Sequence, residues 1–296
     1  MRPVKAGGRK MEPFVQATGE NGCTVLELAG WTREYPYMTA GFSSRLGGVS
    51  QGAYEGLNCG LHVGDAPNSV VENRRRLAAA VQVPFGDCVY AEQVHGKDVQ
   101  LVTRKQRGAG IDSRETALQA KDGFVTNERG VMLHALFADC VPLFFFDPVR
   151  RAVGLAHAGW RGSVLQIARA AVETMSAAYG TKPRELRAAI GPSIGACCYE
   201  VDGSVIGRVD AVLAELGIRG EGDGADSVYQ LRPDGKAMLS LQQLNRQIMI
   251  KAGILPSHIE ISGLCTSCRT DLFYSHRKEG GATGRMAAWI GLREEV

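Results

Sequence analysis

The chain has 296 residues, of which 45% are hydrophobic and 22% charged, a composition that supports one large buried core and excludes a disordered chain. Its 34 basic and 31 acidic residues give a net charge of only +3, which excludes the strongly basic surface of a nucleic-acid-binding protein. No apolar run has transmembrane length and no secretory signal follows the basic N-terminus, so we expect a cytoplasmic protein without membrane contact.

The first 22 residues are polar and contain several glycines. We expect a flexible tail over residues 1–22, in which Met11 is an alternative start to Met1. No proline- or serine-rich linker and no long charge run divides the rest of the chain. We therefore expect one catalytic domain over residues 23–296.

Two strands are expected next, at residues 24–28 and 37–42, and the second leads into a glycine-containing turn. Ser43, Ser44 and Arg45 begin this turn. Their hydroxyl and guanidinium groups, together with backbone N–H groups, can donate hydrogen bonds to an anion. The same residues would equally suit a surface hairpin loop, so the residues alone leave both interpretations open.

The middle of the chain predicts tight loops, a helix and several strands. Four glycines over residues 52–64 indicate loops, and a capping box at Ser69 and Glu72 predicts the start of a helix. A strand over residues 89–96 contains His95 near its end, and three apolar runs separated by turn residues predict core strands. These runs span residues 131–137, 142–146 and 152–156.

The C-terminal half predicts an amphipathic helix over residues 163–179, a strand at 186–190, a helix at 239–253 and a closing strand at 283–292. The first turn of the 163–179 helix would point its free N–H groups at the preceding glycine-containing turn, which carries Arg161. Such a helix N-terminus favours a bound anion.

Three soft-metal ligands lie beside small residues at the ends of predicted strands: His95, Cys140 and His157. Two imidazoles and one thiolate can hold a catalytic zinc ion, whose fourth position stays open for water or substrate. Their spacing matches no short metal motif. The residues alone therefore leave open whether they form one site or are three structural side chains.

The remaining cysteines are expected to be mostly reduced and buried, because eight cysteines in a chain of this length are too sparse for a disulfide scaffold. Cys265 and Cys268 form the single CxxC motif. A structural zinc site would need a second ligand pair, which the sequence does not reveal, so two buried thiols are expected there. The adjacent Cys197 and Cys198 are expected to be a packing pair.

Several motifs, in order along residues 38–292, closely resemble the YfiH-like, or laccase-domain, proteins. The motifs are Gln93-Val94-His95-Gly96, Asp139-Cys140-Val141-Pro142, Ala156-His157-Ala158-Gly159-Trp160-Arg161-Gly162, Gly191-Pro192-Ser193-Ile194, Cys265-Thr266, Ser275-His276-Arg277 and Thr283-Gly284-Arg285. The resemblance implies a single α/β domain with a central β-sandwich flanked by helices, distantly like the catalytic domain of cytotoxic necrotizing factor. It also implies that His95, Cys140 and His157 bind zinc together.

The resemblance further implies an enzyme that acts on small-molecule purine nucleosides and phosphate, as a monomer or a homodimer. Such enzymes phosphorolyse adenosine, inosine and 5′-methylthioadenosine, and some deaminate adenosine. Phosphorolysis requires groups that hold phosphate against the ribose, and deamination requires zinc to activate water for attack on the purine. We assign substrate or phosphate binding to Ser43, Ser44, Arg45, Asn58, Arg161 and His276, and proton transfer to Asp139 or Glu92.

Two other enzymatic functions and one non-enzymatic function compete with this one. Members of the family were once called polyphenol oxidases, and copper could replace zinc, but the six histidines contain no His-x-His pair of the kind that a multicopper laccase uses. A cysteine hydrolase or deamidase is the stronger alternative, because Cys140 and His157 would also suit a nucleophile and its base. The clustering of ligand-type residues disfavours a non-enzymatic binding module.

Overall fold

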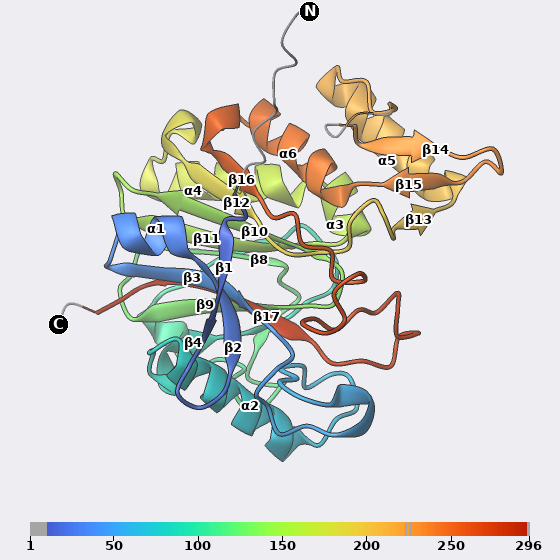
Figure 1. Ribbon diagram of the computed structural model, residues 1–296. Helices are drawn as coiled ribbons and strands as arrows, with labels where there is room; N and C mark the ends of the chain where they lie inside the picture. Colours follow the sequence, from blue (N-terminus) through green and yellow to red (C-terminus); the bar gives the residue numbers. More distant parts are fainter. Residues whose placement is uncertain (1–10, 223, 225–226, 295–296) are drawn as a thin grey trace, which may run out of the picture.

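Two six-stranded sheets stack face to face at the centre of the protein, and helices cover both outer faces (Figure 1). The computed structural model describes residues 11–222, 224 and 227–294. The first sheet has the order β1-β2-β3-β17-β9-β4 and the second has the order β16-β12-β10-β11-β8-β6. The fold class predicted from the sequence, a single α/β domain with a flanked β-sandwich, is confirmed.

The strands of the first sheet are β1 (Phe14–Thr18), β2 (Thr24–Leu28), β3 (Met38–Ser43), β17 (Met286–Leu292), β9 (Val131–Phe137) and β4 (Cys88–Val89). Those of the second are β16 (Ile259–Ile261), β12 (Arg187–Ile190), β10 (Val141–Asp147), β11 (Ala152–Ala158), β8 (Gly123–Thr126) and β6 (Val99–Leu101). Smaller pairings join β5 (Ala91–Glu92) to β7 (Leu118–Gln119), and β13 (Glu200–Val201) and β14 (Tyr229–Leu231) to β15 (Ala237–Leu239).

The helices are α1 (Ala29–Glu34), α2 (Pro67–Ala80), α3 (Trp160–Val164), α4 (Ile167–Tyr179), α5 (Gly203–Leu216) and α6 (Leu241–Lys251). The outer face of the first sheet packs against α2, and that of the second packs against α4 and α6. No helix in the described part of the chain is both long enough and apolar enough to cross a membrane.

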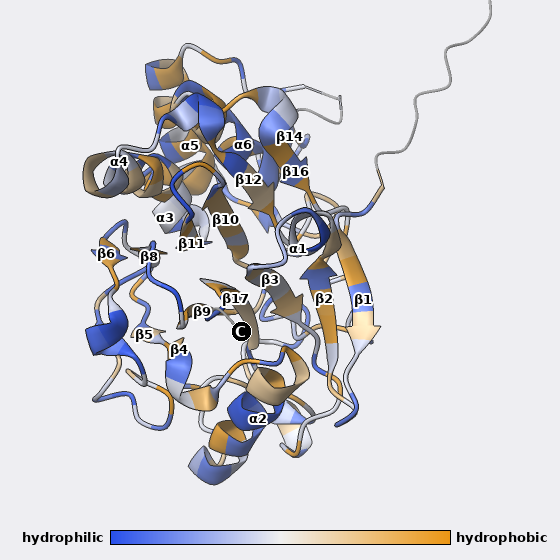
Figure 2. Cartoon of the chain, turned by 90° about the vertical axis from the view of Figure 1, so that its left-hand side faces the viewer, coloured by the Kyte–Doolittle hydropathy of each residue, from blue (hydrophilic) through white to orange (hydrophobic). Residues whose placement is uncertain are grey.

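Strand β10 shows how alternating side chains build this layered core. Phe144 and Phe146 belong to the core between the two sheets, whereas Val141, Leu143 and Phe145 belong to the core beneath the helices. Successive side chains of a strand point to opposite faces, so a strand buried on both faces is apolar throughout. Figure 2 shows the hydrophobic β10 in the middle, with α4, α5 and α6 on one side and β3 and β17 on the other.

The predicted N-terminal tail is wrong for part of its length. Residues 14–18 form strand β1, which pairs antiparallel with β2 across a turn. Phe14 is buried, and its ring lies 5.5 Å from that of Phe144, measured between centroids. The other four residues of this edge strand are exposed, so the segment lacks the buried apolar pattern from which a strand is predicted. Residues 1–10, including Met1, lie outside the described residues.

Two helix predictions also need correction. The helix expected from the capping box at Ser69 begins two residues earlier, at Pro67, and its N-cap residue Ala66 makes no side-chain cap. The single helix expected over residues 163–179 is two helices, α3 and α4, because Gln166 between them has a left-handed φ of 59°. Helix α3 begins at Trp160, before the predicted start, and its N-cap residue is Gly159.

Candidate metal centre and the cavities beside it

His95, Cys140 and His157 converge at one edge of the second sheet. Cys140 directly precedes β10, His157 is the penultimate residue of β11, and these antiparallel strands align Pro142 with His157. His95 follows β5. One ligand atom from each of the three residues lies within 4.8 Å of the others, and the two imidazole rings meet edge to face with centroids 4.8 Å apart. The structure therefore brings together the three residues that the sequence analysis grouped.

The carboxylate of Asp122 orients both histidines. Its Oδ1 lies 2.9 Å from Nδ1 of His157, and its two oxygens accept hydrogen bonds from the backbone N–H groups of Val94, His95 and Gly96 at 2.7 to 3.1 Å. His95 has a left-handed φ of 59°, which these backbone bonds hold in place. Because Nδ1 of His157 faces Asp122, its Nε2 is the nitrogen left to face Cys140.

The buried charges of this group favour the thiolate form of Cys140. Burial alone would raise the pKa of the Cys140 thiol, but the positive charge of His157 and hydrogen bonds from both imidazoles lower it below its usual range. Burial alone would raise the pKa of Asp122 too, but its hydrogen bond with His157 and that residue's charge lower it. Cys140 is therefore held as a thiolate, the form that ligates metals.

The space among the three side chains fits a zinc ion. A Cβ atom added to Gly159 would lie 2.9 Å from Sγ of Cys140 and 3.0 Å from Nδ1 of His95, so only a glycine leaves this space free. Two imidazole nitrogens and one thiolate are ligands that zinc accepts, and three protein ligands leave the open position of a catalytic site. His95 is exposed and His157 is buried, so the open side faces solvent.

A cavity lies on each side of the three residues, and His95 and Cys140 line both. The first, here called the polar cavity, has a volume of about 260 Å³ and presents the side chains of His62, Glu92, His276 and Arg285. The second, here called the apolar cavity, has a volume of about 240 Å³ and presents Trp160, Arg161, Ile194, Tyr199 and Leu241. The candidate metal centre thus adjoins one cavity that contains several ionisable side chains and another that is mostly aromatic and aliphatic.

Comparison with known proteins identifies the family of this fold and site. The family described as multi-copper polyphenol oxidoreductase laccase matches residues 39–293. The chain belongs to this laccase family. A relative from Bacillus subtilis named purine nucleoside phosphorylase YlmD is 44% identical over 87% of this chain and 89% of its own length. A relative from an unknown prokaryotic organism, named adenosine deaminase RL5, is 34% identical over 82% of this chain and 90% of its own.

Solved structures of the laccase family agree with this assignment. The crystal structure of YlmD from Geobacillus stearothermophilus superposes with a TM-score of 0.86 at 40% identity, over 95% of this chain and all of that chain. A protein from Bacillus licheniformis described as YfiH superposes with a TM-score of 0.85 at 38% identity, over 94% of this chain and 99% of that one. The predicted resemblance to the YfiH-like proteins is confirmed.

Among the predicted substrate-binding residues of this laccase-family chain, only two line a cavity. His276 lines the polar cavity and Arg161 lines the apolar cavity. Arg45 instead forms an ion pair with Glu279 at 3.0 Å and donates to the carbonyl of Thr270. Its guanidinium therefore secures the loop that contains His276 and lines neither cavity, and the phosphate contact of Arg45 stays a prediction.

The other three predicted residues also make internal hydrogen bonds. Ser43 and Ser44 are fully buried, and their Oγ atoms accept from the backbone N–H groups of Ala287 and Leu46. Asn58 is equally buried, and its Oδ1 accepts from the backbone of Arg285 at 2.9 Å. The predicted turn and loop thus support the site from behind and do not line either cavity.

His62 and Arg285 line the polar cavity but were not among the predicted substrate-binding residues. The guanidinium of Arg285 is fixed by two hydrogen bonds to the backbone carbonyls of Thr283 and Gly284. Partial burial and the charge of Arg285 lower the pKa of His62, so its ring is neutral near pH 7. Arg285 was visible in the Thr-Gly-Arg motif, whereas a single histidine in a glycine-rich loop carries no signal of its own.

The two residues expected to transfer protons already have partners. Glu92 lines the polar cavity but pairs with Arg114 through both carboxylate oxygens, at 2.6 and 3.0 Å. Asp139 accepts hydrogen bonds from the hydroxyl of Thr266 at 2.6 Å and the backbone of Arg277 at 2.7 Å. Asp139 therefore fixes the position of the adjacent Cys140.

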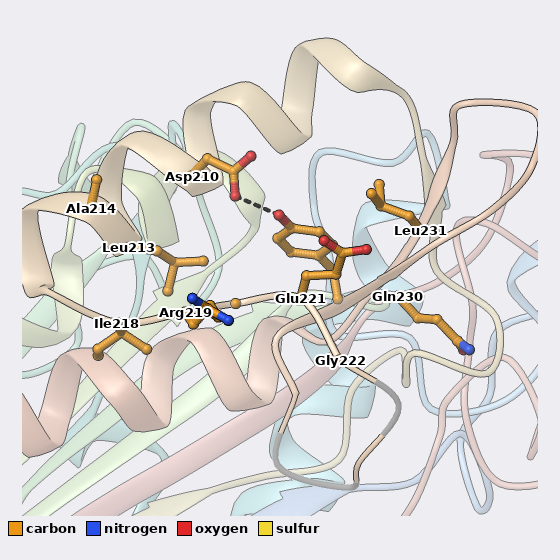
Figure 3. A pocket seen from close by; sticks show the side chains of 11 residues that line it. Asp210, Leu213, Ala214, Ile218, Arg219, Glu221, Gly222, Gln230 and Leu231 are labelled. Atoms are coloured by element: carbon orange, nitrogen blue, oxygen red, sulfur yellow. Dashed lines mark hydrogen bonds between the residues drawn. The ribbon is translucent and has the colours of Figure 1, made fainter.

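A further hollow lies beside α5 and β14 and is lined by residues between 210 and 231. The hydroxyl of Tyr229 donates to the Asp210 carboxylate, a bond of 2.7 Å. Figure 3 shows Asp210 among the residues that line this hollow, with Leu213 and Ile218 in the apolar part of its wall. The residues that line this hollow include none of the predicted site residues and no histidine or cysteine. This hollow therefore offers none of the side chains that ligate soft metals.

Proposed function

We propose that this protein is a zinc-dependent purine nucleoside phosphorylase that cleaves adenosine, inosine or 5′-methylthioadenosine with phosphate, and that it can also deaminate adenosine. The observation that carries the proposal is the position of His95, Cys140 and His157 between a cavity rich in ionisable groups and an apolar cavity. The names of the relatives, purine nucleoside phosphorylase and adenosine deaminase, support the same substrate class.

The two cavities suit the two substrates. Arg285 and His276 can donate hydrogen bonds to phosphate in the polar cavity, where the arginine supplies the positive charge. The purine ring suits the apolar cavity, where Trp160 can stack against it. Burial raises the pKa of Tyr199 to about 12, so its hydroxyl stays protonated and can donate to the departing base. The ribose would then lie beside Cys140, which lines both cavities.

In phosphorolysis a phosphate oxygen forms a bond to the anomeric carbon, and the bond from that carbon to the purine nitrogen breaks. Holding phosphate against the ribose makes this attack effectively intramolecular, and the phosphate charge stabilises the positive charge that develops on the sugar. A zinc ion held by His95, Cys140 and His157 would supply Lewis-acid chemistry and activate water for deamination. Asp122 keeps the His157 ring in its ligating orientation.

One assay tests the proposed activity. Purified protein is incubated with adenosine in the presence and absence of phosphate, and adenine, inosine and hypoxanthine are resolved by chromatography. We expect adenine and ribose 1-phosphate that depend on added phosphate, with a smaller amount of inosine that does not. Production of inosine alone would make the protein a deaminase, and the absence of every product with all three nucleosides would contradict the proposal.

Replacement of Arg285 by alanine should weaken phosphate binding, whereas the same change at Arg45 should not. A hydrogen bond to a charged group contributes about 1.5–3 kcal/mol, so R285A should raise the half-saturating phosphate concentration roughly 10- to 150-fold. Arg45 pairs with Glu279, so R45A should change this concentration by less than about fivefold, which corresponds to the upper value of about 1 kcal/mol for an ion pair near the surface.

Initial rates over a phosphate series at saturating nucleoside give both values, and R285K provides a conservative control that keeps the charge. We expect R285K to recover part of the lost affinity. If R45A and R285A raised the half-saturating concentration equally, Arg45 would take part in phosphate binding, as the sequence predicts.

A cysteine hydrolase is the second candidate, and one observation favours it. Asp122, His157 and Cys140 form a continuous series of orienting carboxylate, base and thiolate, which is also the arrangement of a nucleophilic cysteine enzyme. His95 also lies close to the Cys140 sulfur. This favours a metal-binding role of Cys140 over a nucleophilic one, because a nucleophile needs only one base. The two candidates differ in what Cys140 binds, either the metal or the substrate.

A further inference from the structure

Four cysteines, in two pairs that are far apart in the sequence, form a second cluster outside the candidate metal centre. One Sγ atom from each of Cys197, Cys198, Cys265 and Cys268 lies within 4.8 Å of the others, and we call them the four-cysteine cluster. The sequence predicts a packing pair at Cys197 and Cys198 and two buried thiols at Cys265 and Cys268. This prediction is wrong, because the two pairs lie against each other. In addition, Cys197 and Cys268 are exposed.

The topology of the second sheet explains why the two pairs meet. Strands β12 and β16 are adjacent and parallel, so the chain leaves both strands at the same edge of the sheet. The loop after β12 carries Cys197 and Cys198, and the loop after β16 carries Cys265 and Cys268. A backbone hydrogen bond from Thr266 to the carbonyl of Ser193, 3.0 Å long, aligns the two loops.

The distances among the sulfur atoms fit a tetrahedral metal site. Sγ of Cys268 lies 3.6 Å from Sγ of Cys197 and 3.4 Å from Sγ of Cys198. Four thiolates around one zinc ion, each about 2.3 Å from it, are separated by about 3.8 Å. A disulfide would instead bring two sulfurs to about 2.05 Å and leave the other two without a role. The cluster therefore has the ligand number, element and spacing of a closed zinc site.

The backbone beside the cluster is suited to thiolates. The N–H group of Gly195 donates to Sγ of Cys265 at 3.2 Å, which offsets the negative charge of that sulfur. A Cβ atom added to Gly195 would lie 3.2 Å from Sγ of Cys197 and 3.7 Å from Sγ of Cys265, so the backbone closely approaches two of the four ligands. Close backbone N–H donors of this kind accompany structural metal–thiolate sites, because four thiolates on one divalent ion leave net negative charge.

We propose that the four-cysteine cluster binds one structural zinc ion, separate from the ion at His95, Cys140 and His157. All four positions of this second ion are taken by protein sulfur, so it has no open site for substrate. Its role is to hold the loop after β12 against the loop after β16. Zinc binding would also keep the exposed Cys197 and Cys268 reduced and unreactive.

The two loops that this zinc would join also shape the active site. Thr266, between Cys265 and Cys268, donates its hydroxyl hydrogen to Asp139 at 2.6 Å, and the backbone N–H of Ile194 donates to the carbonyl of Asp139 at 2.9 Å. Asp139 directly precedes Cys140, and its left-handed φ of 82° depends on these bonds. Ile194 also lines the apolar cavity. The second zinc would thus position Cys140 and one cavity wall without touching substrate.

Zinc content of the full-length protein tests this proposal. The protein is purified under reducing conditions and loosely bound metal is removed. Inductively coupled plasma mass spectrometry should then give two zinc ions per chain in the wild type. The C197S/C268S double variant should retain one, and because both side chains are exposed the change disturbs little packing. The H95A/H157A double variant should also retain one. C23A, which removes a buried thiol outside both sites, should retain two.

A cobalt spectrum separates the two sites further. Cobalt-loaded wild type should show intense thiolate-to-cobalt charge transfer, of which C197S/C268S loses most and H95A/H157A loses little, because the second site supplies four of the five thiolates. One zinc ion in the wild type that C197S/C268S also retains would overturn the proposal, as would a disulfide within the cluster in the protein purified with reductant. Neither measurement depends on which reaction the enzyme catalyses.

Discussion

The C140S variant is expected to lose one zinc ion per chain and to lower kcat/KM for nucleoside cleavage by roughly 10³-fold or more, about 4 kcal/mol of transition-state stabilisation. A serine hydroxyl stays protonated near neutral pH, whereas the charge of His157 and its hydrogen bonds make Cys140 a thiolate. Only His95 and His157 would then remain, and two imidazoles do not hold zinc at a catalytic site.

Zinc content and activity of C140S, measured on the same preparation, distinguish the two candidate functions. If Cys140 is a metal ligand, zinc and activity fall together, and wild type stripped by a chelator regains activity when zinc is restored. If Cys140 is a nucleophile, activity falls while the zinc content matches that of wild type. C23A is the matched control, because it removes a buried thiol that contacts neither site and should keep both values. Unchanged zinc in C140S would remove it from the metal centre.

The layered core was predictable from the sequence where burial alone determines the pattern. The apolar runs at 131–137, 142–146 and 152–156 correspond to β9, β10 and β11, within two residues at each end. Strand β1 was missed because it lies at a sheet edge and buries only Phe14. Helix α5 was not predicted, because Gly203 and Gly207 and several β-branched residues weaken its helical propensity.

The predictable part of the site consists of residues that are common metal ligands, whatever their position in the fold. His95, Cys140 and His157 were grouped by ligand type and by the family resemblance. The role of Asp122 was not predictable, because an Asp-Gly pair is ordinary turn chemistry until the fold brings it to His157, 35 residues away. The ion pair of Arg45 was not predictable for the same reason, since its partner Glu279 lies 234 residues away.

The four-cysteine cluster was not predictable either, because it depends on contact between two distant segments. The CxxC motif shows no second ligand pair nearby in the sequence, and nothing around Cys197 and Cys198 indicates that they bind a metal. Each pair supplies what the other needs, but only the parallel pairing of β12 and β16 brings them together. Parallel pairing is not encoded in local periodicity, because both strands are only three or four residues long. A ligand pair without a visible partner is therefore better treated as half of a site.

Replacement of Gly159 by alanine should disable the metal centre without removing any ligand. The φ of Gly159 is −69°, which alanine adopts readily, so the backbone is not strained. The added methyl group, however, would lie 2.9 Å from Sγ of Cys140 and 3.0 Å from Nδ1 of His95, inside normal contact distance. One of the two side chains must move, so zinc affinity and kcat/KM should each fall roughly 10²-fold.

Zinc affinity by chelator competition, kcat/KM and the thermal midpoint together test G159A against G203A. Gly203 also lies at the start of a helix, but a Cβ atom there meets nothing within 4 Å, so G203A should match wild type in zinc affinity and activity. We expect G159A to keep a thermal midpoint within a few degrees of wild type, because the strain falls on two side chains at an open edge. Wild-type zinc affinity in G159A would mean that the ion does not sit between Cys140 and His95, since the methyl group would occupy that space.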